Sequence, residues 1–184
     1  MMAPTHVFAG LALVTPVAYQ VPEFSNALAV GAILGGLAPD VDLVFDHRRS
    51  LHFPVLGALV AIPLGIVAVV VPATITVGLA TFVVTAWVHA VSDVAGNGPE
   101  MDPWTDPIDR AVYDHARGTW IRPRRWIRYD GAPEDALLAV ALAIPALVVF
   151  DGWVVAIIAG GIAVSVTYAL FRRRVVEWIP EWLE

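Results

Sequence analysis

The feature that most constrains this chain is a long stretch without charge. From Phe53 to Trp87 the sequence contains no Asp, Glu, Lys or Arg. About 20 such residues span the hydrocarbon core of a bilayer as a helix, so the stretch is long enough to cross twice. Only 15% of the 184 residues are charged, whereas soluble domains contain about 25%. We therefore expect the whole chain, residues 1–184, to form a single integral membrane domain.

Proline, glycine and charged residues divide the apolar sequence into six segments. They cover residues 6–21, 25–38, 53–71, 74–95, 135–150 and 153–171. Because backbone polar groups in lipid must be satisfied within the chain, these segments are expected to be helices. The prediction is an all-α polytopic membrane protein with about six helices, arranged as three consecutive αα-hairpins. The second segment is short for a full span, so the first hairpin is either re-entrant or fully spanning.

All eleven basic residues are arginines, and they lie in three connections. Arg48 and Arg49 separate the second segment from the third, six more lie within 110–128, and the last three are residues 172–174. The three hairpin turns contain none. Because Arg and Lys concentrate on the inner side of a membrane, this pattern predicts a cytoplasmic-membrane protein with both termini inside. No basic residue precedes the first segment, so we expect that segment to be retained rather than cleaved.

Two polar regions lie on the predicted inner side: a loop over 96–133 and a tail over 172–184. A short helix is expected in the loop near residues 108–117, ended by Gly118. Tryptophans in the loop and the tail predict that both regions lie against lipid headgroups, so membrane lipid is one expected partner. The formal net charge of −6 and the lack of lysine argue against nucleic-acid binding, and the lack of cysteine excludes a thiolate metal site.

Histidine and aspartate recur in four short groups near the predicted inner side. The groups are Thr5-His6, Pro39-Asp40-Val41-Asp42, the loop from His47 to His52, and His89-Ala-Val-Ser-Asp93. His89 and Asp93 are four residues apart and share one helix face. Ionisable side chains in an apolar helix are costly and usually functional. The predicted topology brings all four groups to one face of the membrane.

These groups predict a metal centre. The candidate ligands are His6, Asp40, Asp42, His47, His52, His89 and Asp93. Imidazole and carboxylate ligands suit a divalent ion such as Zn, with Mn or Fe as alternatives. Seven ligands exceed the needs of one tetrahedral ion, so one or two ions per chain are expected, with a dinuclear site using them all. Asp42 is then a bridging ligand or the base that orients water, and Arg48 is expected to stabilise charge on a phosphoryl oxygen.

The order and spacing of these groups resemble the YdjM-type family of membrane-bound metal-dependent hydrolases. The matching elements are Thr5-His6 with Gly10, Pro39-Asp40-Val41-Asp42, His47-Arg48 with His52, and His89 with Asp93. The resemblance covers residues 5–104, and the third motif differs from the family pattern at Arg49, Leu51 and Phe53. It implies a hydrolase at the cytoplasmic membrane interface, for which we expect phosphoester or lipid-headgroup substrates.

Two other classes of function remain open from the sequence. A non-catalytic membrane protein would use the same residues in closed metal coordination, without an open position for water. A transporter would place coupling residues near the middle of the bilayer in broken helices. The segment 74–95 has no ionisable residue before His89, which makes transport the weaker alternative.

Overall fold

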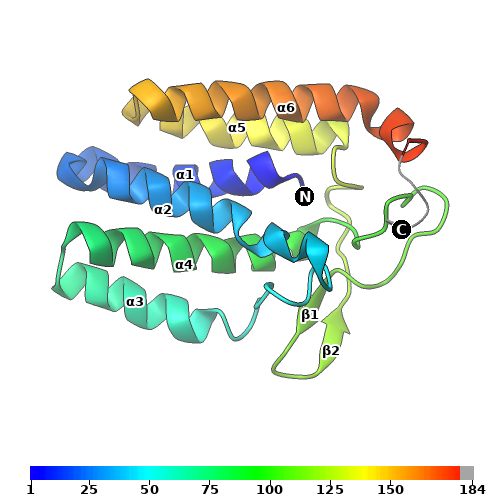
Figure 1. The fold of residues 1–184 in the computed structure, drawn as a ribbon, viewed down its shortest axis with the longest axis horizontal. Helices are drawn as coiled ribbons and strands as arrows, with labels where there is room; N and C mark the ends of the chain where they lie inside the picture. The colour runs from blue at the N-terminus through cyan, green and yellow to red at the C-terminus, as the bar shows by residue number, and fades with distance from the viewer. Residues whose placement is uncertain (179–184) are drawn as a thin grey trace.

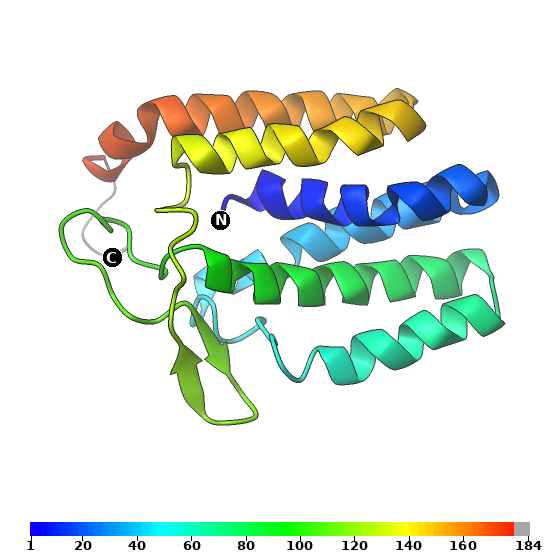
Figure 2. The same cartoon turned by 180° about the vertical axis from the view of Figure 1, so that it is seen from behind.

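The computed structural model describes residues 1–178. Within them, six α-helices lie side by side along one common direction (Figures 1 and 2). They are α1 (Ala3–Gln20), α2 (Ser25–Leu37), α3 (Ala58–Val70), α4 (Thr74–Ser92), α5 (Pro133–Val149) and α6 (Gly152–Val176). Three short 3₁₀ helices cover Pro22–Phe24 (η1), Pro39–Val44 (η2) and Asp93–Ala95 (η3). The mostly helical prediction is confirmed.

The helices form three layers of two, with α1 and α2 in the middle (Figure 1). Helix α1 packs against α2 and α5, α2 packs against α4, and α3 covers the outer side of α4. The interior of the bundle is apolar, and Phe8, Leu11 and Ile158 are completely buried. The central position of α1 holds its first turn, which carries His6, among α2, α4 and α5.

Glycines allow the central helices to approach closely. A Cβ atom at Gly31 would lie 2.6 Å from the carbonyl oxygen of Gly78 on α4, and one at Gly35 would collide with the carbonyl oxygen of Phe82. At Gly36 the neighbour is α1, because a Cβ there would lie 2.7 Å from the Cα of Val7. Small residues therefore set the spacing of α2 from both α4 and α1. Gly31 and Gly35 are four residues apart, the spacing of small residues that is typical of closely packed membrane helices.

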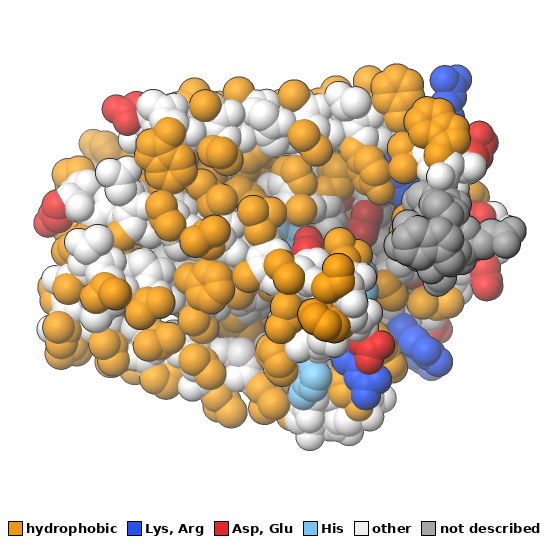
Figure 3. Space-filling view, viewed as in Figure 1, with side chains coloured by type: hydrophobic (Ala, Val, Ile, Leu, Met, Phe, Trp, Pro, Cys, Tyr) orange, Lys and Arg blue, Asp and Glu red, His pale blue; other side chains and the backbone are white. Residues whose placement is uncertain are grey.

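Three segments are long and apolar enough to cross a membrane, judged by length and composition within the described residues: Pro22–Val44, Thr74–Ala95 and Gly152–Val176. Helix α3 is apolar but shorter. Large apolar side chains face outward on several helices, including Val69, which is 81% exposed. Figure 3 shows hydrophobic side chains over the body of the bundle and most charged ones at the end that carries the loops. These properties are those of a membrane protein.

The expected short helix near residues 108–117 is wrong. The chain there forms an antiparallel ribbon of β1 (Val112–Asp114) and β2 (Thr119–Ile121), with Tyr113 opposite Trp120. Gly118, at φ +67°, supplies the left-handed residue of the turn. The Asp114 carboxylate accepts a hydrogen bond from the backbone of Ala116 at 2.9 Å. The ribbon lies in the long loop, so the chain is not purely α-helical.

Two further boundaries differ from the prediction. Helix α3 begins at Ala58 rather than Phe53, because the residue before Pro54 is disfavoured in a helix and the carbonyl of Pro54 accepts a hydrogen bond from Trp87 Nε1 instead. Helix α6 continues to Val176, so the start of the predicted tail is helical. The rest of that tail prediction, residues 179–184, lies outside the described residues.

Candidate metal centre

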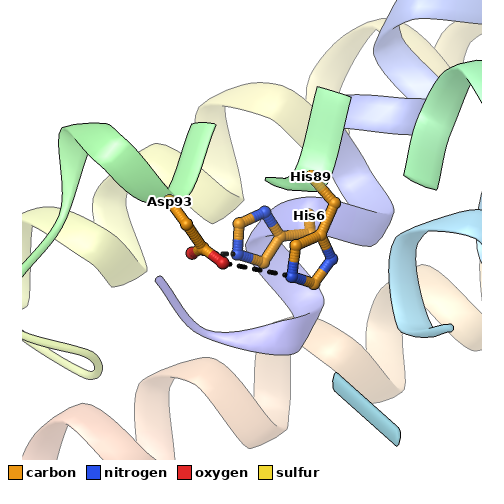
Figure 4. A group of neighbouring side chains, drawn as sticks. All are labelled: His6, His89 and Asp93. Atoms are coloured by element: carbon orange, nitrogen blue, oxygen red, sulfur yellow. Dashed lines mark ion pairs between the residues drawn. The ribbon is translucent and has the colours of Figure 1, made fainter. Parts of the chain in front are cut away.

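Segments far apart in the sequence bring histidine and aspartate side chains together at the end of the bundle that carries the loops. The first turn of α1 contributes His6, the end of α4 contributes His89, and η3 begins with Asp93. His52 comes from the connection between η2 and α3, and Asp40 from η2. In Figure 4 the Asp93 carboxylate faces the rings of both His6 and His89. All of these side chains except that of Asp40 are buried.

Each of the three buried imidazoles uses its Nδ1 atom to bond to a fixed neighbour. Nδ1 of His89 lies 2.7 Å from the carbonyl oxygen of Gly36, and Nδ1 of His52 lies 2.9 Å from Oδ2 of Asp42. Nδ1 of His6 lies 3.1 Å from Oγ of Ser92, whose own hydrogen goes to the carbonyl of His89. All three neighbours are acceptors, so the neutral rings carry their hydrogen on Nδ1. The lone pair of each ring is then on Nε2.

The three Nε2 atoms converge on carboxylate oxygens. Nε2 of His6 lies 3.1 Å from Oδ1 of Asp93, and the Nε2 atoms of His52 and His89 lie 3.2 Å and 3.4 Å from Oδ2 of Asp93. Nε2 of His89 is also 3.3 Å from Oδ1 of Asp40. None of the three Nε2 atoms, nor Oδ2 of Asp93, has a hydrogen-bond partner. Lone pairs that face carboxylate oxygens repel each other unless a positive charge lies between them.

This donor set fits a divalent metal ion. His6, His89 and Asp93 offer ligand atoms within 4.8 Å of one another, and so do Asp40, His52 and His89. Two ligand atoms that each lie about 2.0–2.1 Å from a tetrahedral zinc ion are about 3.3–3.4 Å apart, which is close to the observed separations. The two groups share His89, whose only free nitrogen can bind a single ion. They therefore describe one compact centre with five donor residues rather than seven.

Asp42 is buried but lies behind the centre instead of in it. One of its oxygens accepts from Nδ1 of His47 at 2.8 Å, and the other accepts from Nδ1 of His52 at 2.9 Å and from the backbone of Leu51 at 3.1 Å. With both oxygens occupied, the expected role of Asp42 as a bridging ligand does not fit the geometry. Its position is that of a carboxylate that orients the imidazole of His52.

His47 also differs from the expected ligand role. Its Nδ1 is held by Asp42, and its ring is not among the converging donors. The side chain is 21% exposed and lines a hollow of about 350 Å³ together with Asp40, Leu43 and Asp130. The fifth histidine, His115, lies in the β-ribbon turn, where Nε2 is 2.7 Å from the carbonyl oxygen of Arg49 and the ring packs 4.6 Å from that of Phe53; it is not among the converging donors.

Arg48 is buried beside the centre, and its guanidinium is already engaged. It donates to the carbonyl of Asn97 at 2.9 Å and to Oδ2 of Asp130 at 3.0 Å, and it lies 3.7 Å from Oδ1 of Asp93. Burial lowers the pKa of Arg48, but the nearby carboxylates of Asp93 and Asp130 raise it by a larger amount, so the net shift of the pKa is upward. This geometry positions Asp93 and does not match the expected contact with a phosphoryl oxygen.

Several supporting residues were not predicted. Ser92 and Gly36 supply the acceptors for His6 and His89, and Asp130 pairs with Arg48. Asp135 of α5 accepts from Oγ1 of Thr5 at 2.7 Å and thereby anchors the first turn of α1 next to His6. Asp130 and Asp135 lie far along the chain from the four His/Asp groups. The only sequence signal for them was their position among the polar residues that precede the fifth apolar segment.

In comparisons with protein-family models, curated proteins and solved structures, none matches this chain. The site therefore has to be interpreted from its own chemistry.

Proposed function

We propose that the protein is a membrane-embedded, metal-dependent hydrolase. The observation that carries this proposal is the convergence of three buried Nε2 atoms and Oδ2 of Asp93, all without hydrogen-bond partners. Buried polar atoms are rarely left unpaired, and four of them close together favour a cation-binding site. We expect one divalent ion per chain, zinc in the first instance, held by His6, His52, His89 and Asp93 with Asp40 beside them.

When bound by these residues, a divalent ion would lower the pKa of water and polarise the bond to be cleaved. The protein supplies the rest of the chemistry. Asp40 is partly exposed and lines the hollow next to the donors, so the reacting group of a substrate enters there. His47 lines the same hollow, and its Nδ1 is fixed by Asp42. We assign to its Nε2 lone pair the proton of the attacking water, which the resulting imidazolium then passes to the leaving group.

The substrate we propose is a phosphoester, with a lipid headgroup as the first class to test. A second hollow of about 890 Å³ is lined by His47, by Arg49 and Arg110, and by four carboxylates, those of Asp46, Glu100, Asp102 and Asp106. Guanidinium groups suit phosphoryl oxygens. The apolar helices that flank the centre favour a substrate that is itself resident in the membrane.

The proposed location is the cytoplasmic membrane, with both termini and the metal centre on the inner side. This placement is supported by the arginine distribution in the sequence and by the charged end of the bundle in Figure 3. The resemblance of the His/Asp motifs to the YdjM-type family supports the same class of reaction, since four motifs recur in order over residues 5–104.

The metal content of the purified protein tests the proposal. We expect elemental analysis in detergent to find about one divalent ion per chain, and His89→Ala to lose it. His115→Ala is the matched control, because that imidazole is bonded to the carbonyl of Arg49 and is not among the converging donors. Equal metal in both variants, or no metal in the wild type, defeats the proposal. Metal bound without hydrolysis of any phosphoester would instead favour the non-catalytic alternative.

A further inference from the structure

An apolar groove lies near the candidate metal centre, between α4 on one side and α3 with the segment that precedes it on the other, and Ala38 and Pro39 close one end. Its volume is about 500 Å³, within the range of roughly 300–1,000 Å³ that small-molecule sites occupy. Every residue that lines it is apolar, including Phe53, Leu56, Val60, Phe82, Ala86 and Trp87. The one polar atom of the Trp87 ring, Nε1, is already bonded to the carbonyl of Pro54 at 2.8 Å. The groove therefore offers no group for a polar ligand.

Residues that are consecutive in the sequence line the groove and the polar hollow. Pro39 lines the groove, whereas Asp40 lines the hollow. On the other side, Leu51 lines the groove and is followed by His52, whose Nε2 faces Asp93. Helix α4 carries Ala86 and Trp87 along the groove and, in its last turn, His89 at the centre. The apolar groove and the polar hollow are thus neighbours, and their linings match the apolar part and the polar part of one molecule.

We propose that this groove holds one hydrocarbon chain of a membrane lipid while the headgroup of the same lipid lies at the metal centre. The proposal rests on the proposed function, because it names the substrate class of that site. A hydrocarbon chain needs no polar partner, whereas a peptide segment in the groove would leave backbone groups unsatisfied. The surrounding lipid is as apolar as the groove, so a hydrocarbon chain gains no hydrophobic free energy by entering it. The groove instead selects the chain by its shape and fixes the position of the lipid relative to the metal centre.

Photo-crosslinking tests this assignment. The probe is a phosphatidylglycerol with a diazirine in one acyl chain, incubated with the whole protein in detergent micelles, and the labelled residues are mapped by mass spectrometry. We expect labels on the segments 53–60 and 82–87 in excess of the outward face of α6, where Leu170 is 75% exposed to any annular lipid. Equal labelling of both surfaces means a passive lipid shell and overturns the proposal. Covalent pairs of protein chains would assign the groove to a second copy and overturn it as well.

Two valines of α3 provide a matched pair of variants. Val60 lines the groove, whereas Val69 lies on the same helix, outside the groove and 81% exposed. Val60→Trp is expected to lower groove labelling by about tenfold, the size of effect that a change in pocket volume produces, while Val69→Trp leaves labelling unchanged. Val83→Phe, from the α4 wall, is a second variant that fills the same space. Unchanged labelling in both groove variants contradicts the proposal.

The metal content of these variants separates the two proposals. The groove residues are not donors, so both filled variants are expected to retain the ion and the hydrolysis of a short, water-soluble phosphoester. Loss of groove labelling with the metal retained supports the groove. Retained labelling together with retained metal leaves the hydrolase proposal standing and removes the groove from it. If the wild-type protein contains no metal, the hydrolase proposal is wrong. The assignment of the groove as part of a substrate site is then wrong as well.

Discussion

Asp42 and His52 form a buried hydrogen bond of 2.9 Å between Oδ2 and Nδ1, which turns Nε2 of His52 towards Asp93. Both side chains are completely buried, so the ring is fixed in one orientation. The same carboxylate holds His47 through its other oxygen. A single aspartate thus orients one imidazole towards the metal centre and a second towards the polar hollow.

The first prediction concerns this orienting carboxylate. Asp42→Asn keeps the volume but replaces a charged acceptor by an amide, so we expect metal affinity to fall about 10–100-fold while the fold is retained. Chelator competition in detergent measures the affinity. Asp46→Asn is the control, because the Asp46 side chain is 70% exposed and its nearest partner is the exposed Arg49. Equal affinities in the two variants would falsify the orienting role.

The second prediction separates His47 from the metal donors. His47→Gln is expected to keep the ion, since the ring is not among the converging atoms, and to lower phosphoester hydrolysis about 10²–10⁴-fold through loss of the proton donor. The loss should appear in kcat rather than KM, and the pH dependence of kcat should change. His115→Gln should affect neither quantity. If His47→Gln abolished metal binding, His47 would be a ligand after all.

The third prediction concerns the buried guanidinium of Arg48. Only 2% of this side chain is exposed, whereas 47% of its neighbour Arg49 is. Arg48→Met removes the donors to the carbonyl of Asn97 and to Asp130, whose side chain is 29% exposed, so we expect a loss of about 1–3 kcal/mol in the free energy of unfolding. Arg49→Met should cost under about 1 kcal/mol. Thermal unfolding of both variants makes the comparison, and similar melting temperatures would show that the Arg48 pairs contribute little.

The fourth prediction is a pH dependence of metal affinity. Burial lowers the pKa of His52, but its hydrogen bond to Asp42 and the negative charge of Asp93 raise it more, so in the metal-free protein the pKa lies above 6.5. The proton must leave before the nitrogen can bind an ion, so affinity should fall as the pH drops from about 8 to about 6. The stability of the metal-free protein should depend on pH in the opposite direction. Charged His52 contributes stability below pH 6.5, and this contribution is lost as the pH rises through the raised pKa.

Chelator competition at several pH values measures the first effect, and thermal unfolding of the metal-free protein measures the second. The matched sample is His52→Gln, which has no such proton and should show a flatter dependence in both. A metal affinity that is constant from about pH 6 to pH 8 contradicts the assignment of His52 as a donor.

The helices were predictable because their apolar segments are long and bounded by proline, glycine and charge. The close packing of α2 was predictable from Gly31 and Gly35, since only small residues permit it. The β-ribbon was missed because its strands are three residues each, too short for any periodicity. Gly118 was interpreted as the end of a helix, whereas it forms the turn, and both uses need the same left-handed backbone.

The sequence singled out seven histidines and aspartates, five of which the structure places close enough to share an ion, but it could not assign their roles. Asp42 and Asp40 are two residues apart, and only the orientation of the short η2 helix directs one behind the centre and the other towards it. The role of an imidazole depends on which of its nitrogens meets an acceptor, and that is decided by tertiary contacts. Asp130 could not be linked to Arg48 because 82 residues separate them.

The last prediction uses Gly36, whose carbonyl holds His89 while its Cα faces α1. A Cβ atom there would lie 2.7 Å from Cα and 2.8 Å from the backbone nitrogen of Val7, and backbone atoms cannot move aside cheaply. Gly36→Ala should therefore push α1 and His6 away, lowering stability by about 1–3 kcal/mol and weakening metal binding. Gly65→Ala in α3 is the control, since nothing lies within 4 Å of its added Cβ, and helix propensity alone should stabilise it by about 1 kcal/mol. Metal binding that survives Gly36→Ala at full strength would mean that His6 is not held by this contact.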